Sequence, residues 1–308
     1  MEIPRRNITT DLGLLFLVLI WGINFSVLKI VLRELDPLAL NALRFPIAAL
    51  ALWMLVRRLD GPLRPDPGDV GRIIALGLLG NVAYQLFFIF GVNSTLAGNA
   101  SLMLATTPVW TVLLSSLAGH ERPGIGVVIG VAGTLMGIFM VISGGRDAGT
   151  LGGPTIRGDI LILIASVLWA TYTVGGQKPV TRYGALRVTA WTLWVATPLI
   201  FVMGVPDLMR TDFRAVTPEV WLGVVYAGLL GIGLAYLLWY RGVQRIGNNR
   251  TAVYSNLVPV AALFTAWIWL GETPATLQLI GATVILASLT LARLAQSPDP
   301  GSLRWNSS

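Results

Sequence analysis

The sequence contains no cysteine, and His120 is its one histidine. A chain without thiols can form neither disulfides nor thiolate metal sites, and one histidine cannot build the usual zinc centres. The HExxH motif of metalloproteases and the lysine motif of P-loop nucleotide-binding proteins are also absent. We therefore expect no catalytic residues, no metal or other cofactor, and no ATP-driven pumping.

Charged residues are scarce, and their scarcity indicates the class of protein. They make up 12% of the chain, against about a quarter of a typical soluble domain. Hydrophobic residues make up 55%, and the mean hydropathy is +0.72. The composition is that of an integral membrane protein in a lipid bilayer. The net charge of +7 does not point to nucleic acid, because the basic residues form short clusters between apolar runs instead of one patch.

Ten apolar segments are each close to the roughly 20 residues that a helix needs to cross a bilayer. Backbone groups in lipid must bond to one another, and the period-2 alternation of barrel strands is absent, so these segments are expected to be helices. The predicted fold class is an all-α membrane protein with ten transmembrane helices near residues 12–32, 38–56, 73–92, 97–118, 124–143, 158–177, 186–205, 220–240, 251–270 and 275–292.

The distribution of lysine and arginine between alternate loops predicts the orientation of the chain. Fifteen lie on the side that carries both termini, and five lie on the other side. Because cytoplasmic loops collect positive charge, we expect both termini in the cytoplasm of a bacterium and the helices in its inner (plasma) membrane.

The two halves of the chain repeat each other. A shift of 151 residues places "GLLGNVAYQLFFIFGV", from Gly77, on "GLLGIGLAYLLWYRGV", from Gly228. A shift of 148 places Trp21 on Trp169. We therefore expect two five-helix repeats, residues 1–148 and 149–308, in one membrane domain. Because five is odd, the repeats cross the membrane in opposite directions, as in secondary transporters whose substrate site lies at the midplane between halves.

These motifs resemble a known family. The stretches "WGINFSVLK", "NALRFPIAALAL", "ASLMLATTPVWTVLL" and "AVYSNLVPVAALF", with Glu-x-Pro after each of the last two, resemble the drug/metabolite transporter superfamily, EamA type. Within it the chain is most similar to the YddG-type amino-acid exporters of bacterial inner membranes. The resemblance implies export through a cavity lined by segments 12–32, 73–92, 97–118, 158–177, 220–240 and 251–270, with 124–143 and 275–292 at the periphery.

Depth along the first segment separates two polar residues. At about 1.5 Å per residue, Lys29 lies about 26 Å from the cytoplasmic start of the helix, and Asn24 about 18 Å from it. Lys29 is therefore expected at the outer interface, where a lysine can reach water. Asn24 is near the midplane and shares a face with Trp21, three residues earlier. The 148-residue shift puts Trp169 and Tyr172 at the same two places in the second half.

The candidate substrate-binding residues combine aromatic faces with hydrogen-bonding groups, a lining that suits a small amphipathic solute such as an aromatic or apolar amino acid. Each of them has a structural alternative, since a tryptophan can simply pack and Asn24 can bond to a neighbouring helix. Lys29 and Arg44 are predicted at a mouth or gate. The structural alternatives are an interfacial anchor for Lys29 and a bond to helix-end carbonyls or Asp36 for Arg44. The full candidate set is Trp21, Asn24, Tyr84, Gln85, Asn99, Ser101, Trp169, Tyr172, Tyr236, Tyr254 and Asn256.

Four further residues are predicted to have structural roles. Pro108 and Pro259 are expected in the middle turns of their helices, which they would bend. Glu121 and Glu272 precede prolines at helix starts, where an acid suits the positive end of the dipole, and gating is the alternative role. The GxxxG runs at 126–130 and 133–137 predict close helix packing, either within the chain or between chains of an oligomer.

Three functions follow from these features. The leading one is export of amino acids or similar small molecules by alternating access. The second is transport of anionic metabolites such as nucleotide sugars or sugar phosphates, which would need more cations in the cavity than Lys29 and Arg44. The third is a non-transporting membrane scaffold, which would leave no solvated path between the halves.

Overall fold

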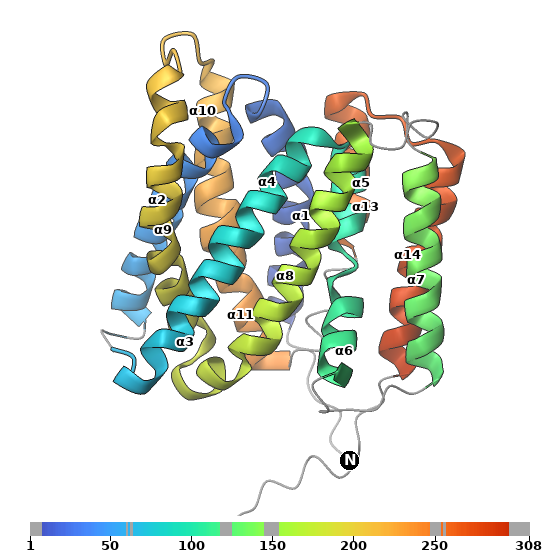
Figure 1. The fold of residues 1–308 in the computed structure, drawn as a ribbon, viewed down its shortest axis with the longest axis horizontal. Coiled ribbons are helices and arrows are strands. Elements are labelled where there is room, and N and C mark those ends of the chain that lie inside the picture. Colours follow the sequence, from blue (N-terminus) through green and yellow to red (C-terminus); the bar gives the residue numbers. More distant parts are fainter. Residues whose placement is uncertain are drawn as a thin grey trace, which may run out of the picture.

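The computed structural model describes residues 8–59, 61, 64–117, 125–144, 154–246, 254 and 257–295 (Figure 1). Every regular element in these ranges is a helix, and each of the ten predicted segments contains helical structure. The elements in chain order are α1 (Ile8–Val31), α2 (Pro37–Leu59), α3 (Pro67–Gly77), η1 (Leu78–Ala83), α4 (Tyr84–Ser94), α5 (Ala97–Leu104), α6 (Thr107–Leu117), α7 (Ile125–Ser143), α8 (Pro154–Tyr183), α9 (Ala185–Arg210), α10 (Pro218–Val225), η2 (Tyr226–Leu234), α11 (Ala235–Ile246), α13 (Val258–Leu270) and α14 (Thr276–Ala295).

Six helical stretches are long and apolar enough to cross a membrane by themselves, and shorter apolar helices accompany them. The predicted all-helical membrane fold is therefore confirmed. Large apolar side chains cover the outside of the bundle, as lipid contact requires. Phe139 on α7 and Leu222 on α10 are examples, with 67% and 71% of their surface exposed.

The fourth predicted segment is not one continuous helix. It divides into α5 and α6 at Ala105 and Thr106, so Pro108 stands in the first turn of α6 and not in the middle of a helix. A proline offers no N–H to the carbonyl four residues earlier. The hydroxyls of Thr106 and Thr107 instead donate to the carbonyls of Met103 and Leu104, at 2.6 and 2.7 Å.

The other proline and the two glutamates also differ from expectation where they are described. Pro259 likewise stands in the first turn of its helix, α13, which begins at Val258. Glu121 and His120 lie outside the described residues. Glu272 accepts hydrogen bonds from the backbone N–H groups of Ala97 and Gly98, at 3.0 and 3.3 Å. It therefore caps α5 and not α14, the helix that follows it in the sequence.

The third and eighth spans each contain a π-helical segment, η1 and η2. The 151-residue shift places η1 on residues 229–234, the last six residues of η2. Each segment contains glycine, one residue in η1 and three in η2, and neighbouring helices approach most of these glycines closely. A Cβ on Gly80 would lie 2.2 Å from the ring of Tyr172, and a Cβ on Gly231 would lie 2.8 Å from Oδ1 of Asn24. Since π-helical segments often mark functional sites, we expect a functional site near these two contacts.

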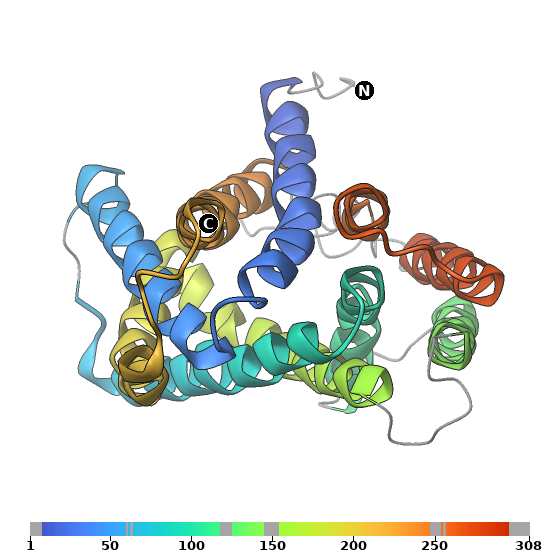
Figure 2. The same ribbon diagram turned by 90° about the horizontal axis from the view of Figure 1, so that it is seen from above.

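Helices α7 and α14 pack against each other at one edge of the bundle, away from α2 and α9 (Figures 1 and 2). A Cβ on Gly133 would lie 2.2 Å from the hydroxyl oxygen of Ser288, and one on Gly137 would lie 2.8 Å from the carbonyl oxygen of Gly281. The GxxxG run at 133–137 therefore serves packing within the chain. The peripheral position of these two helices is the one that the family resemblance implies.

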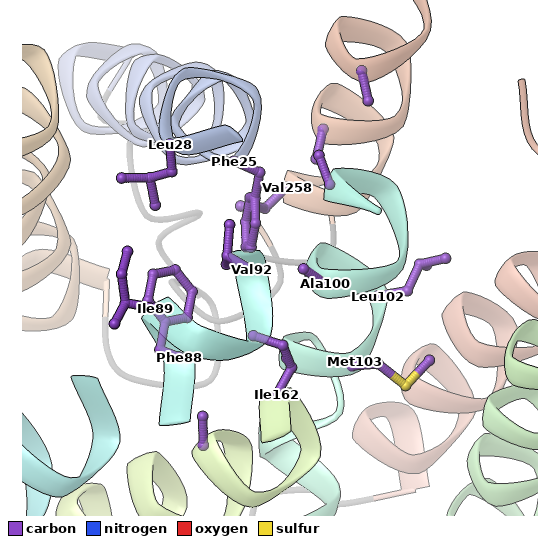
Figure 3. Packing of buried hydrophobic residues seen from close by; sticks show 14 of the residues in the cluster. Phe25, Leu28, Phe88, Ile89, Val92, Ala100, Leu102, Met103, Ile162 and Val258 are labelled. Atoms are coloured by element: carbon purple, nitrogen blue, oxygen red, sulfur yellow. The ribbon is translucent and has the colours of Figure 1, made fainter. Parts of the chain in front are cut away.

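The largest apolar core lies where α1, α4, α5, α8 and α13 converge (Figure 3). Phe25 and Leu28 of α1 and Val92 of α4 point into it. Ile162 of α8 closes it from the second half of the chain, and all four side chains are at most 4% exposed. The core thus joins helices from both halves on one side of the bundle centre.

Candidate functional site

Aromatic rings from the first, third, sixth and eighth spans meet at the centre of the bundle. Trp169 of α8 is the hub, because its ring centroid lies 4.9 Å from that of Tyr84, 5.3 Å from that of Tyr172 and 6.0 Å from that of Tyr236. We define the aromatic cluster as the rings that continue these contacts: Trp21, Phe25, Tyr84, Phe88, Trp169, Tyr172, Tyr236 and Trp239. The structure therefore brings together the predicted aromatic residues of these four spans.

The cluster is not uniformly buried. The three tyrosines, Tyr84, Tyr172 and Tyr236, are 7–9% exposed, whereas Trp21 and Trp169 are half-buried. Phe25 and Phe88 connect the cluster to the apolar core, with their ring centroids 6.0 Å apart (Figure 3). Part of each indole thus remains exposed, and an exposed ring face can hold a flat apolar group.

Trp21 and Asn24 both contact Gly231 of η2. The indole N–H of Trp21 donates to the carbonyl oxygen of Gly231 at 3.1 Å. Asn24 is 9% exposed, and its Oδ1 has no hydrogen-bond partner among the residues that the structure describes. A buried amide oxygen without a donor is costly, at about 1–3 kcal/mol. A hydrogen bond to a neighbouring helix, the structural alternative for Asn24, therefore does not account for this oxygen.

The equivalent side chains in the second half are hydrogen-bonded to each other. Tyr172 stands where the 148-residue shift places Asn24, and its hydroxyl shares a hydrogen bond of 3.0 Å with the hydroxyl of Thr192 on α9. Thr192 is in turn the counterpart of Arg44. A Cβ added to Gly77 would lie 2.8 Å from the carbonyl oxygen of Thr192. A Cβ added to Gly228 would lie 2.8 Å from that of Arg44. The two halves therefore place the same backbone at the same depth but with different side chains.

Arg44 lies deeper in the bundle than a mouth position. Its side chain is 1% exposed, and its Nε donates to Oδ1 of Asn41 at 2.9 Å. Its Nη2 donates to Oε1 of Gln85 at 2.7 Å, and its guanidinium carbon lies 6.0 Å from the ring centroid of Phe88. Arg44 therefore bonds to two neutral side chains, and not to Asp36 or to helix-end carbonyls. Gln85 takes part in the site through Arg44.

Lys29 lies at the end of α1 that the depth calculation predicts. Its Nζ donates to the carbonyl oxygen of Asn93 at 3.2 Å. A pocket of about 380 Å³ lies beside it, lined also by Arg33, Leu96, Glu272 and Gln278. Lys29 thus belongs to the predicted outer end of the bundle and not to the aromatic cluster.

Asn99 and Ser101 have their hydrogen bonds elsewhere. Asn99 donates to Oδ2 of Asp159 at 3.4 Å and accepts from Gln278 at 3.0 Å. Thr95 also donates to Asp159, at 2.5 Å. The hydroxyl of Ser101 donates to its own helix, at the carbonyl of Gly98. These contacts give both residues a packing role near the start of α5.

Asp159 is a buried carboxylate that the sequence did not single out. It is 1% exposed and joins α8 to α5 through the hydrogen bonds above. In the sequence it follows Gly158 at the start of an apolar segment, where an acid commonly interacts with the helix dipole. The one available signal was repeat symmetry, because the 148-residue shift places Asp11 on Asp159.

Asp11 instead has a partner from the ninth span. The hydroxyl of Tyr254 donates to Oδ1 of Asp11 at 2.8 Å. Asp11 and Lys29 are 18 residues apart on α1, or about 27 Å by helical rise, so Tyr254 is at the opposite end of the bundle from Lys29. Asn256, the last candidate, lies outside the described residues.

Comparison with known proteins gives consistent matches over nearly the whole chain. Residues 8–143 and 156–294 each match the EamA-like transporter family. An uncharacterized transporter of Archaeoglobus fulgidus is 30% identical over 298 residues, which cover 94% of this chain and 99% of that protein.

Two relatives carry functional names. A probable terminal-alkyne amino-acid exporter of Streptantibioticus cattleyicolor is 28% identical, covering 94% of this chain and 97% of that protein. A probable amino-acid metabolite efflux pump of Escherichia coli is 27% identical, with coverages of 89% and 91%. One protein of known crystal structure shares the fold, with a TM-score of 0.66 at 22% identity and coverages of 95% and 99%.

Proposed function

Because the chain belongs to the EamA-like transporter family, we propose that it exports small amphipathic metabolites, with aromatic or apolar amino acids as the substrate class. The observation that carries the proposal is the aromatic cluster, where half-buried indoles stand beside buried hydrogen-bonding groups at the meeting point of four spans. Such a site holds an apolar side chain against ring faces and the polar head against hydrogen-bonding groups.

The transport mechanism that we propose is alternating access between two inverted repeats, residues 1–148 and 149–308. The matched contacts of Gly77 and Gly228 with α9 and α2, respectively, support this division. So does the occurrence of π-helical segments at corresponding places. Inverted-repeat transporters place the substrate between the repeats, where the aromatic cluster lies.

The relatives' names agree with this substrate class, since one is a probable amino-acid exporter and another a probable amino-acid metabolite efflux pump. Transport of nucleotide sugars or sugar phosphates is the second candidate, and the buried cation Arg44 is the observation that favours it. Lys29 lies near the C-terminal end of α1 and not in the cluster. A single central cation suits one carboxylate better than a phosphate, which prefers several donors and charges.

The cellular setting follows from the same assignment. The family and the named relatives are transporters, so we assign no catalytic step to this chain. From the fifteen basic residues on one side, we infer a multi-pass protein of the bacterial inner membrane with both termini in the cytoplasm.

The test of the proposed function is counterflow with the purified protein in liposomes. We expect radiolabelled phenylalanine to exchange against unlabelled phenylalanine, tryptophan or leucine about 10-fold faster than against aspartate, lysine or a sugar phosphate. Burial of one apolar side chain is worth about 1.5–3 kcal/mol, which corresponds to at least that ratio. Exchange of sugar phosphates without exchange of any amino acid would instead favour the second candidate.

A further inference from the structure

Arg44 is a buried cation whose described hydrogen-bond partners are neutral. Its hydrogen bonds within the described part of the chain go to the amide oxygens of Asn41 and Gln85 and use two of the five N–H groups that a guanidinium offers. The ion pairs among the described residues join Arg182 to Asp66 and Asp69, and none includes Arg44. A guanidinium that is 1% exposed inside a membrane helix therefore has no counter-ion in the part of the chain that the structure describes.

The position equivalent to Arg44 in the second half carries no charge. In the second half, the counterpart position holds Thr192, which bonds to Tyr172. The backbone around the two positions is alike, since each has its carbonyl oxygen 2.8 Å from the Cβ position of a matched glycine. A hydroxyl is thus sufficient for packing at this place, and a charged side chain costs more to bury. The first half therefore carries an additional charge whose purpose is not packing.

Asn24 supplies the complementary group. It is the counterpart of Tyr172, so the bonded pair of the second half corresponds to Asn24 and Arg44 in the first half. In the first half both groups are incompletely satisfied, since Oδ1 of Asn24 has no donor among the described residues. The side chain of Asn24 and the backbone carbonyl of Arg44 flank the same segment, η2, against Gly231 and Gly228, respectively. One offers a cation and the other an acceptor.

We propose that Arg44 binds the carboxylate of the transported amino acid and that Oδ1 of Asn24 accepts a hydrogen bond from its ammonium group. This inference rests on the proposed function and adds the head-group site to it. The side chain of the solute then lies on the ring faces of Trp169 and Tyr84. Asn41 and Gln85 act as positioning residues, because their amide oxygens hold the guanidinium in place and leave an edge for a carboxylate.

The charge pattern of the solute also follows. A zwitterion satisfies both groups at once, whereas an amine without a carboxylate places a second cation beside Arg44. A carboxylate without an ammonium satisfies Arg44 but leaves Oδ1 of Asn24 without a donor. The site should therefore prefer phenylalanine to phenethylamine strongly and to 3-phenylpropionate more weakly.

The test measures inhibition of phenylalanine counterflow by these three compounds in the parent protein and in Arg44→Gln. In the parent protein, phenylalanine should compete about 10- to 100-fold better than phenethylamine, the range expected for a charge-assisted pair. In Arg44→Gln this preference should fall to about 3-fold or less, with phenethylamine inhibiting as well as before or better. Asn24→Leu should instead reduce the preference for phenylalanine over 3-phenylpropionate.

Controls separate this inference from the function on which it rests. Arg57→Gln changes an exposed arginine of the same helix and should keep the parental preference. Arg44→Lys keeps a charge without the planar fork and should give an intermediate preference, which provides a second variant if Arg44→Gln does not fold. Parental preference in both Arg44 variants would overturn the head-group site and leave amino-acid transport standing. A parent protein that exchanges no amino acid would overturn both.

Discussion

Gly80→Ala is expected to reduce transport at least 10-fold and to lower the free energy of unfolding by about 1–3 kcal/mol, the usual range for overpacking. The added Cβ would lie 2.2 Å from Cδ2 and 2.4 Å from Cγ of Tyr172. Ring atoms at that distance cannot rotate away without moving α8 or breaking the hydrogen bond to Thr192. Transport is measured by counterflow, and stability by the midpoint of thermal unfolding in detergent.

Gly233→Ala is the matched control for this prediction. Gly233 also lies in a π-helical segment, but a Cβ there would lie 3.5 Å from that of Ala51, an ordinary contact. The control should therefore transport as the parent does and unfold at the same temperature or slightly higher. Equal behaviour of the two variants would show that the contact between η1 and Tyr172 is not close in the working protein.

Trp169→Ala should have the second large effect, a loss of affinity for aromatic substrates of about 10-fold or more. Trp169 touches three other rings, and each aromatic pair is worth roughly 0.5–1.5 kcal/mol beyond its buried area. In the proposed site, a ring of the solute packed on the exposed part of this half-buried indole would add one more pair of this kind. The concentration of phenylalanine that gives half-maximal counterflow measures the change, and Trp169→Phe should recover most of it.

Trp267→Ala is the control, because it removes a tryptophan that lies outside the aromatic cluster. Trp267 lies on α13 and is 56% exposed on the outside of the bundle, where lipid surrounds it. Its replacement should leave the half-maximal concentration within about 2-fold of the parental value. If it weakened phenylalanine as much as Trp169→Ala did, the loss would reflect general destabilisation and not a lost binding surface.

The sequence predicted the centre of the bundle well, because periodicity and repeat symmetry both report on it. Trp21, Trp169 and Tyr172 were selected by depth and by the 148-residue shift, and the structure places them in one cluster with Tyr236. Depth along a helix also separated Lys29 from Asn24. Both quantities depend on residues within one helix, which sequence spacing describes directly.

Partners from distant segments were not predictable in this way. The bond of Arg44 to Gln85 joins residues 41 positions apart, and the cap that Glu272 forms on α5 spans 175. Spacing within a helix says nothing of which neighbour faces a polar group, so Arg44 was expected at a mouth and Asn99 in the cavity. The break between α5 and α6 was not predicted. There the hydroxyls of Thr106 and Thr107 bond to backbone carbonyls, and residue spacing does not reveal such bonds.

The central claim is that solute passes through the aromatic cluster, and the absence of cysteine allows a direct measurement. A single cysteine at Asn24→Cys is treated with a water-soluble, membrane-impermeant thiol reagent in vesicles of either orientation. Leu19→Cys on the same helix is the control, because Leu19 is 52% exposed on the outside of the bundle and should face lipid. We predict that the cysteine at position 24 reacts and that phenylalanine slows its reaction several-fold, while the cysteine at position 19 does not react. An unreactive cysteine at position 24 in a variant that still transports would contradict the claim.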